Sequence, residues 1–132
     1  MDHHLETLKN SKIIAQKQKV LLQVNLSKEP SKAGYLKEAL IKDWSTLLNL
    51  KNLEICGLMT MPPLVSDPEL NRPYFRELKS LITLLKEKSS PEHAIKLTEL
   101  SMGTSHDYLV ATEEGATMVR LGTVLFGERE SQ

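Results

Sequence analysis

The sequence has a single cysteine, no long apolar run and no excess of either charge. Cys56 alone excludes a disulfide within the chain, and so little cysteine is typical of a reducing cytoplasm. A helix that spans a bilayer needs about 20 apolar residues, and no run approaches that length. The first residues also show no basic-then-apolar signal pattern. We therefore expect a cytoplasmic protein with no membrane partner.

The balance of charge argues against nucleic acid as a partner. The 17 basic and 17 acidic residues cancel, and the sequence shows no basic stripe or arginine-rich run, the usual footprint of nucleic-acid binding. A metal site is not expected either. His3 and His4 are adjacent, and adjacent residues on a helix point in different directions. With 132 residues, the chain is long enough for one domain over residues 1–132 and no more.

Helix-like and strand-like patterns alternate along the chain. Apolar residues recur at helical spacing in 3–17, in 36–48, in the segment opened by Ser66-Asp67-Pro68 and in 106–114, where Gly115 ends the pattern. Short apolar runs at 20–26, 53–59, 97–102 and 117–121 are typical of strands. The run at 20–26 is almost continuously apolar, which predicts a strand covered on both faces. The third helix should bury five side chains, Phe75, Leu78, Leu81, Ile82 and Leu85.

This alternation predicts an α/β fold with about four parallel strands joined by right-handed crossovers. No Gly-x-Gly-x-x-Gly turn follows the first strand, so a dinucleotide-binding sheet is not supported. A complete (β/α)8 barrel usually needs about 250 residues, about twice the length of this chain. We therefore expect half of such a barrel, with two unpaired sheet edges and an apolar inner face in water.

Two turns near the end of the sequence suggest a phosphate site. The apolar run ending at Met102 enters Gly103-Thr104-Ser105, and the run around Val119 enters Gly122-Thr123. Small hydroxyl and glycine residues leave backbone N–H groups and short O–H donors open to a phosphate. Two such turns after neighbouring strands match the phosphate site of many eight-stranded barrels. Arg120 lies inside the second apolar run, and a buried charge there needs a partner.

Six stretches together resemble a known family. They are LLQVNL at 21–26, SKAG at 31–34, GLMTMPP at 57–63, LSMGTSHD at 100–107, GATMVRLGT at 115–123 and FGER at 126–129. In this order and register the sequence resembles the YggS/PROSC-type pyridoxal phosphate (PLP) homeostasis proteins. That family is a single-domain PLP-binding barrel similar to the N-terminal domain of alanine racemase. The resemblance begins after the family's fourth strand, so we expect a C-terminal half that lacks the family's Schiff-base lysine, which lies on its first strand.

The resemblance implies a role for several residues of this sequence. Ser101 and the turn at Gly103 would hold the PLP phosphate from one side, and Gly122 with Thr123 from the other. Arg120 would face the pyridine nitrogen. Because arginine does not readily exchange a proton, it would keep the ring neutral and a poor electron sink. No catalytic residue is expected.

Three further residues are weaker candidates for the PLP site. Met59 packs either beside the cofactor or in the core. Ser105 either supports the turn or caps the helix that follows, and Asp107 falls in that helix's first turn, where it favours the dipole. Lys32, in the SKAG stretch, is the lysine we favour for ligand contact. Cys56, by contrast, should be a buried packing residue.

The function that the resemblance implies is non-enzymatic binding and buffering of PLP inside the cell. PLP-dependent enzymes, or a separate N-terminal half, would then be the partners. The first alternative is a racemase-like PLP enzyme. Racemisation needs bases on both faces of the ligand, and the lysine base is absent. No tyrosine is an obvious replacement, because Tyr35, Tyr74 and Tyr108 all fall in helix-like segments. The second is an inactive remnant, or a half that works only with a separate N-terminal half.

Overall fold

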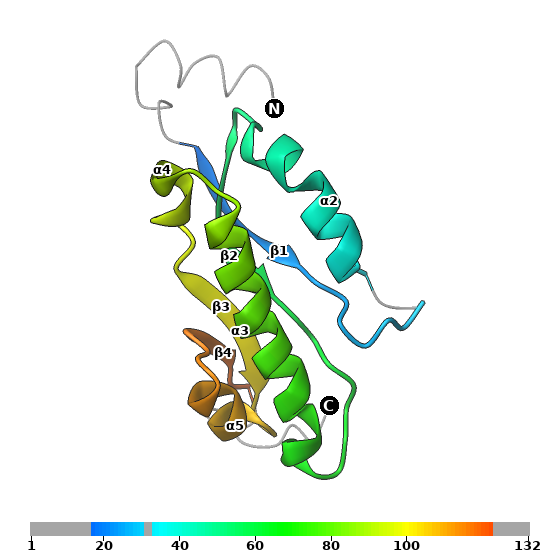
Figure 1. The fold of residues 1–132 in the computed structure, drawn as a ribbon. Coiled ribbons are helices and arrows are strands. Elements are labelled where there is room, and N and C mark those ends of the chain that lie inside the picture. Colours follow the sequence, from blue (N-terminus) through cyan, green and yellow to red (C-terminus); the bar gives the residue numbers. More distant parts are fainter. Residues whose placement is uncertain (1–16, 31–32, 123–132) are drawn as a thin grey trace, which may run out of the picture.

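The computed structural model describes residues 17–30 and 33–122, in which strands and helices alternate (Figure 1). The strands are β1 (Gln18–Gln23), β2 (Leu53–Met59), β3 (Glu99–Thr104) and β4 (Met118–Arg120). The helices are α2 (Lys37–Leu48), α3 (Arg72–Glu87), α4 (Pro91–Ala94) and α5 (Tyr108–Glu113), with a short 3-10 helix, η2 (Pro68–Asn71), before α3. The helix expected over 3–17 falls almost wholly outside the described residues.

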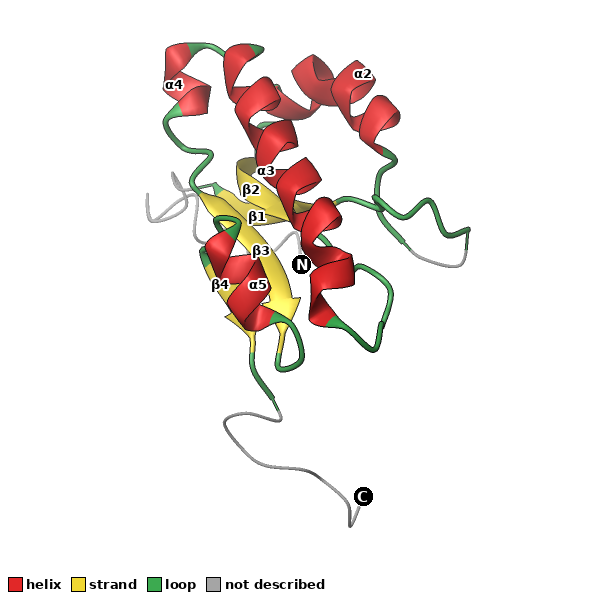
Figure 2. Ribbon diagram, turned by 60° about the horizontal axis from the view of Figure 1, so that its bottom comes forward, coloured by secondary structure: helices red, strands yellow, loops and turns green. Residues whose placement is uncertain are grey.

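The four strands form one sheet, are parallel and pair in chain order, β1-β2-β3-β4. Because right-handed crossovers between strands in this order all return on the same side, the helices cover one face (Figure 2). A doubly wound sheet instead reverses its strand order part-way. The predicted parallel α/β arrangement is confirmed, and its topology is that of one half of a (β/α)8 barrel.

The core lies between this covered face and the helices. All five residues predicted to face inward from α3 are buried. They pack with Leu40 and Trp44 of α2 and with alternate residues of the sheet, among them Leu58, Leu100 and Met102. Within the described part of the chain, no helix has the length and apolar character needed to cross a membrane.

The opposite face of the sheet is uncovered in the described residues, and its character differs from the expectation. It bounds an open hollow of about 550 Å³, lined in part by Lys19, Glu54, Cys56, Glu99 and Met118. The lining is therefore mixed: Leu21, Ile95 and Met118 are apolar as expected, and charged groups of both signs stand among them. The expectation that the first strand is covered on both faces is wrong, since no residue of β1 is fully buried.

A bulge in β2 explains the position of Cys56. Val20 pairs with Ile55 but Leu21 pairs with Gly57, so Cys56 is the extra residue and strand alternation is broken there. Ile55 is buried in the core, whereas Cys56 is partly exposed and lines the hollow. Burial raises the pKa of the Cys56 thiol, and a hydrogen bond to Glu54 adds to this. The expectation of a core cysteine is therefore wrong.

The first strand also ends earlier than predicted. Val24 lies beyond the last residue pair of β1 and β2, although its N–H still donates to the Met59 carbonyl at 2.8 Å, and it forms an isolated parallel bridge with Tyr35. The Tyr35 N–H donates to the Gln23 carbonyl at 2.8 Å, and the Asn25 N–H donates to the Tyr35 carbonyl at 2.7 Å. Tyr35 is thus part of an extended segment beside the end of β1, and not part of a helix as expected.

The uncovered face and the edges at β1 and β4 should make the 132-residue chain self-associate, because unpaired strand edges pair with other edges. We expect the sedimentation coefficient to rise with protein concentration. Met118→Glu, which places a charge at the border of the hollow, should weaken this association. Leu109→Glu is the matched control, since Leu109 is 66% exposed on the helix side. A monomer at all concentrations would contradict this reading of the uncovered face.

Candidate functional site

The carboxyl ends of the strands meet at one edge of the sheet, and Arg120 lies at their centre. It ends β4, and its guanidinium reaches across β3 to β2. One terminal nitrogen donates to the Ser101 hydroxyl oxygen at 2.9 Å, and the other donates to the Thr60 carbonyl at 3.1 Å. Strand β3 supplies Ser101, and Thr60 directly follows β2. Two of the residues singled out from the sequence, Ser101 and Arg120, are thus in direct contact.

The charge of Arg120 is not neutralised by a contact. Both of its hydrogen-bond acceptors are uncharged, and no carboxylate of the described residues lies within 4 Å of it. Burial lowers the pKa of the guanidinium, and the negative charge of Asp107 acts in the opposite direction. An arginine stays protonated under these conditions. Since a guanidinium has five N–H donors and two are used, the remaining three can bind an anion or a ring nitrogen.

Thr60 is a site residue that sequence reasoning missed. It is 1% exposed, and its hydroxyl donates to the Val24 carbonyl at 2.8 Å. Its N–H donates to the Ser101 carbonyl at 3.1 Å, while its own carbonyl accepts from Arg120. Thr60 therefore joins the ends of all four strands. The available signal was a hydroxyl residue placed directly after a strand, the same kind of signal that singled out the turns near the end of the sequence.

The turn after β3 is built differently from the expectation. Gly103 has φ +103°, and a Cβ there would lie 2.7 Å from the Ala111 side chain. The glycine is thus required by the close approach of α5. The turn's N–H groups are largely used internally, because Thr104 N–H donates to Asp107 Oδ1 at 2.8 Å and His106 N–H donates to Thr104 Oγ1 at 3.3 Å. The phosphate-binding surface expected from this backbone is correspondingly small.

Helix α5 begins at Tyr108, so Asp107 and not Ser105 occupies the N-cap position. Capping by Ser105 is therefore wrong, and Ser105 lies within the turn. Asp107 lies one residue before the first turn in which it was expected; it makes no capping bond to α5, and its side chain is buried against the turn. Gly115, with φ +104°, follows the helix as predicted.

Two of the remaining candidates, Met59 and Gly122, lie among the described residues, and two do not. Met59 pairs in register with Ser101, so the two side chains project from the same face of the sheet. Gly122 lies two residues beyond Arg120, and a Cβ built on it would meet no atom within 4 Å, which leaves space for a ligand. Lys32 and Thr123 lie outside the described residues.

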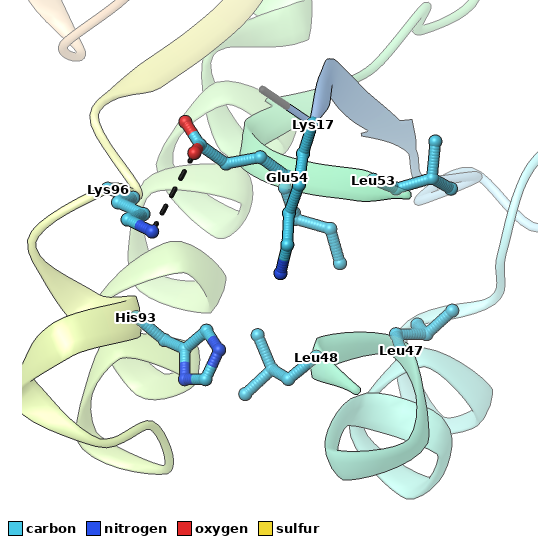
Figure 3. A pocket seen from close by; sticks show the side chains of 8 residues that line it. Lys17, Leu47, Leu48, Leu53, Glu54, His93 and Lys96 are labelled. Atoms are coloured by element: carbon cyan, nitrogen blue, oxygen red, sulfur yellow. Dashed lines mark ion pairs between the residues drawn. The ribbon is translucent and has the colours of Figure 1, made fainter. Parts of the chain in front are cut away.

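A second cavity, at the amino ends of the strands, is too small for a cofactor (Figure 3). It measures about 20 Å³, enough for about one water molecule. Lys17, His93 and Lys96 line it, and Lys96 lies 3.7 Å from the Glu54 carboxylate. No cluster of three or more His, Cys, Asp or Glu side chains that could hold a metal occurs in 17–30 or 33–122.

Comparison with known proteins places this chain in a family. The family model for the alanine racemase N-terminal domain matches residues 2–130. The chain belongs to this family. The resemblance read from the sequence motifs is thereby confirmed, and so is the barrel-type fold class.

Curated relatives carry a functional name. The chain is 47% identical to the pyridoxal phosphate homeostasis protein of Aquifex aeolicus and 50% identical to that of a Synechocystis species, over 86% and 83% of its own length. It spans 48% of each relative, so it covers about half the length of the proteins it matches.

Solved structures of PipY have the same fold as this chain and are likewise covered by it to about half. PipY of Synechococcus elongatus without PLP superposes with a TM-score of 0.76 at 35% identity, over 93% of this chain and 56% of PipY. PipY with PLP bound gives a TM-score of 0.74 at 33% identity, over 96% of this chain and 54% of PipY.

The contacts of Thr60 lead to a stability prediction. Thr60→Val keeps the shape of the side chain but leaves the buried Val24 carbonyl without its donor, which should cost about 1–3 kcal/mol of unfolding free energy. Thr112→Val is the matched control, because the Thr112 hydroxyl donates to the Tyr108 carbonyl on an exposed helix face. Urea unfolding of both variants measures the difference. Equal stability of the two would contradict the linking role of Thr60.

Proposed function

We propose that this chain forms the phosphate- and ring-binding side of a PLP site, and that it serves PLP binding and buffering without catalysis. The observation that carries the proposal is the guanidinium of Arg120, half-buried at the strand ends and held only by uncharged acceptors. Such a cation is suited to an anionic ligand. The name of the curated relatives and the PLP bound to PipY identify the ligand class that fits.

The donors at this edge fit such a ligand. Ser101 accepts from Arg120, and no described residue accepts from its hydroxyl, so that O–H is available to a phosphate oxygen. Gly122 and Thr123 would meet the same phosphate from the other side. Arg120 would donate to the pyridine nitrogen, and Met59 lies on the same sheet face, where it can pack against the ring. Ser105 and Lys32 remain weaker candidates.

The identity of the ring partner favours binding over catalysis. Bound PLP supplies an aldehyde that reacts with amines and a ring that withdraws electrons when its nitrogen is protonated. Arg120 holds its own protons and offers none to that nitrogen, so the ring would stay neutral. This supports a carrier of the cofactor more than a racemase-like enzyme, and PLP-dependent enzymes are the recipients we propose.

The uncovered face of the sheet implies a further partner. Ser101, Met59 and Arg120 project toward this face, whose hollow begins beside Met118. The curated relatives are about twice as long as this chain. We propose that the remaining strands of a barrel, from an N-terminal half, cover this face and complete the site.

The first prediction for this function concerns affinity. The described strands carry only one lysine, Lys19, at the amino end of β1 and away from the site. The chain alone should therefore bind PLP without a covalent link. A few charge-assisted bonds less the ordering costs leave a Kd on the order of 0.1–1 mM.

Absorbance titration measures this affinity, and borohydride reduction with peptide mapping tests for a covalent link. We expect no single lysine to be labelled stoichiometrically. Micromolar affinity with one labelled lysine would contradict the proposal, and Lys32 would then be the first residue to examine. Adding the N-terminal half of a pyridoxal phosphate homeostasis protein should tighten binding.

The second prediction separates the ring contact from the phosphate contact. With the N-terminal half added, Arg120→Ala should weaken PLP by about 2 kcal/mol, roughly 30-fold, and shift the spectrum of the bound cofactor. Competition by inorganic phosphate should persist, because Ser101, Gly122 and Thr123 remain. Thr123→Val should weaken PLP and inorganic phosphate alike and leave the spectrum unchanged.

The reverse result for Arg120→Ala would reassign the residue. If inorganic phosphate no longer competes and the spectrum does not move, Arg120 binds the phosphate and the ring assignment is wrong.

A further inference from the structure

The carboxylate of Asp107 is buried beside the site without a cation in contact. Asp107 is 5% exposed, and no lysine, arginine or histidine of the described residues lies within 4 Å of its oxygens. A buried carboxylate is costly unless hydrogen bonds replace its water. Here the donors are neutral: the Thr104 N–H at 2.8 Å, the Thr104 hydroxyl at 3.3 Å and the Asn71 amide at 3.0 Å.

These bonds hold the turn at 103–106 in shape. Oδ1 takes both donors of Thr104, and the Asp107 N–H donates back to the Thr104 carbonyl at 3.2 Å. The turn is therefore closed on Asp107 and not on a ligand. Its fixed shape sets the end of β3 at Thr104, three residues after Ser101.

Asn71 ties this turn to the preceding loop. It is 2% exposed, and its amide nitrogen donates both to Asp107 Oδ2 and to the Pro63 carbonyl at 3.1 Å. Its own carbonyl oxygen has no donor among the described residues, which costs stability. An apolar residue would avoid that cost but could not make the bond to Asp107. The arrangement therefore favours defined geometry over stability.

The charge of Asp107 also reaches the site, since it acts on the pKa of Arg120 across the sheet end. A carboxylate near an anion site repels the anion. For PLP to bind well here, the geometry that Asp107 imposes on the turn has to outweigh that repulsion.

We infer that Asp107, oriented by Asn71, is a positioning residue of this site: it closes the 103–106 turn so that Ser101 and Arg120 face the phosphate-bearing ligand. This inference rests on the proposed function. It predicts whether PLP affinity rises or falls when Asp107 is replaced, because a nearby negative charge and a positioning group have opposite effects on the affinity for an anion.

The test is Asp107→Asn, titrated with PLP and followed by NMR. If Asp107 were only a nearby charge, its removal would tighten PLP binding. As a positioning residue, its loss should weaken PLP by about tenfold, because the substituted side chain has one acceptor oxygen in place of two and turns an N–H group toward one of the present donors. Glu113→Gln is the matched control: it removes the same charge from α5, its side chain is 64% exposed, and PLP affinity should not change.

Two further variants separate positioning from folding. Asn71→Asp combined with Asp107→Asn exchanges donor and acceptor between the two side chains but leaves the Pro63 carbonyl without its donor, so it should recover part of the lost affinity. Asn71→Leu leaves the charge in place and removes the orienting bond together with the bond to the Pro63 carbonyl, while both bonds from Thr104 to Asp107 remain, so it should weaken PLP less than Asp107→Asn does. Unchanged or tighter binding in Asp107→Asn, or no recovery in the double variant, overturns the inference.

Amide hydrogen exchange without ligand gives a readout independent of the proposed function. The Thr104 amide should exchange about tenfold faster in Asp107→Asn, while the Leu100 and Met102 amides keep their protection. Unchanged exchange at Thr104 overturns the inference even if PLP binds. A wild-type chain that binds no PLP overturns the proposed function, and exchange at Thr104 still decides whether Asp107 holds the turn.

Discussion

Parallel pairing of the strands in chain order is the constraint on which the rest of this structure depends. It sends every crossover to the same side, so the sheet has one face packed by helices and one face without them. It also brings the carboxyl ends of all four strands to one edge. The core and the site are therefore consequences of one topology: Leu58 and Leu100 face the helices, while Ser101 faces away from them.

Two uncompensated charges distinguish the site edge from an ordinary sheet edge. Arg120 is held by a hydroxyl and a carbonyl, and Asp107 by an N–H, a hydroxyl and an amide. Neither has an ion partner in contact within the described residues. Elsewhere charges do pair: Arg72 contacts Glu69, Glu113 and Glu114, and these bonds raise its pKa. Leaving Arg120 unpaired costs stability but keeps its donors open to a ligand.

Much of the fold could be predicted because local patterns and topology agree. The strand at 53–59 was predicted to the residue, since its apolar run is bounded by turn residues on both sides. The helix face of α3 was predicted because the spacing of its apolar residues is regular over about three turns. The end of β1 was not, because the bridge of Val24 to Tyr35 depends on a loop that folds back.

At the candidate site, sequence reasoning could anticipate which residues lie close together where their side chains follow from strand alternation. Arg120 and Ser101 project from one face because of their register, and this is visible in the sequence once the strands are placed. The prediction that Cys56 is a buried packing residue was wrong, because a bulge in β2 breaks the alternation of the strand. The contact between Asn71 and Asp107 was not predicted, because 36 residues separate them and no local pattern shows that the amide of one reaches the carboxylate of the other.

The position of Arg120 connects binding to the covering of the sheet. Its guanidinium projects toward the face that carries the open hollow, so whatever covers that face also removes water from the site. Electrostatic attraction between Arg120 and an anionic ligand grows as water is excluded. A ligand that binds better to the covered state must by linkage favour that state to the same extent. If the proposed function holds, PLP binding and the covering of this face would each favour the other by the same free energy, and Arg120 would be the residue that couples them.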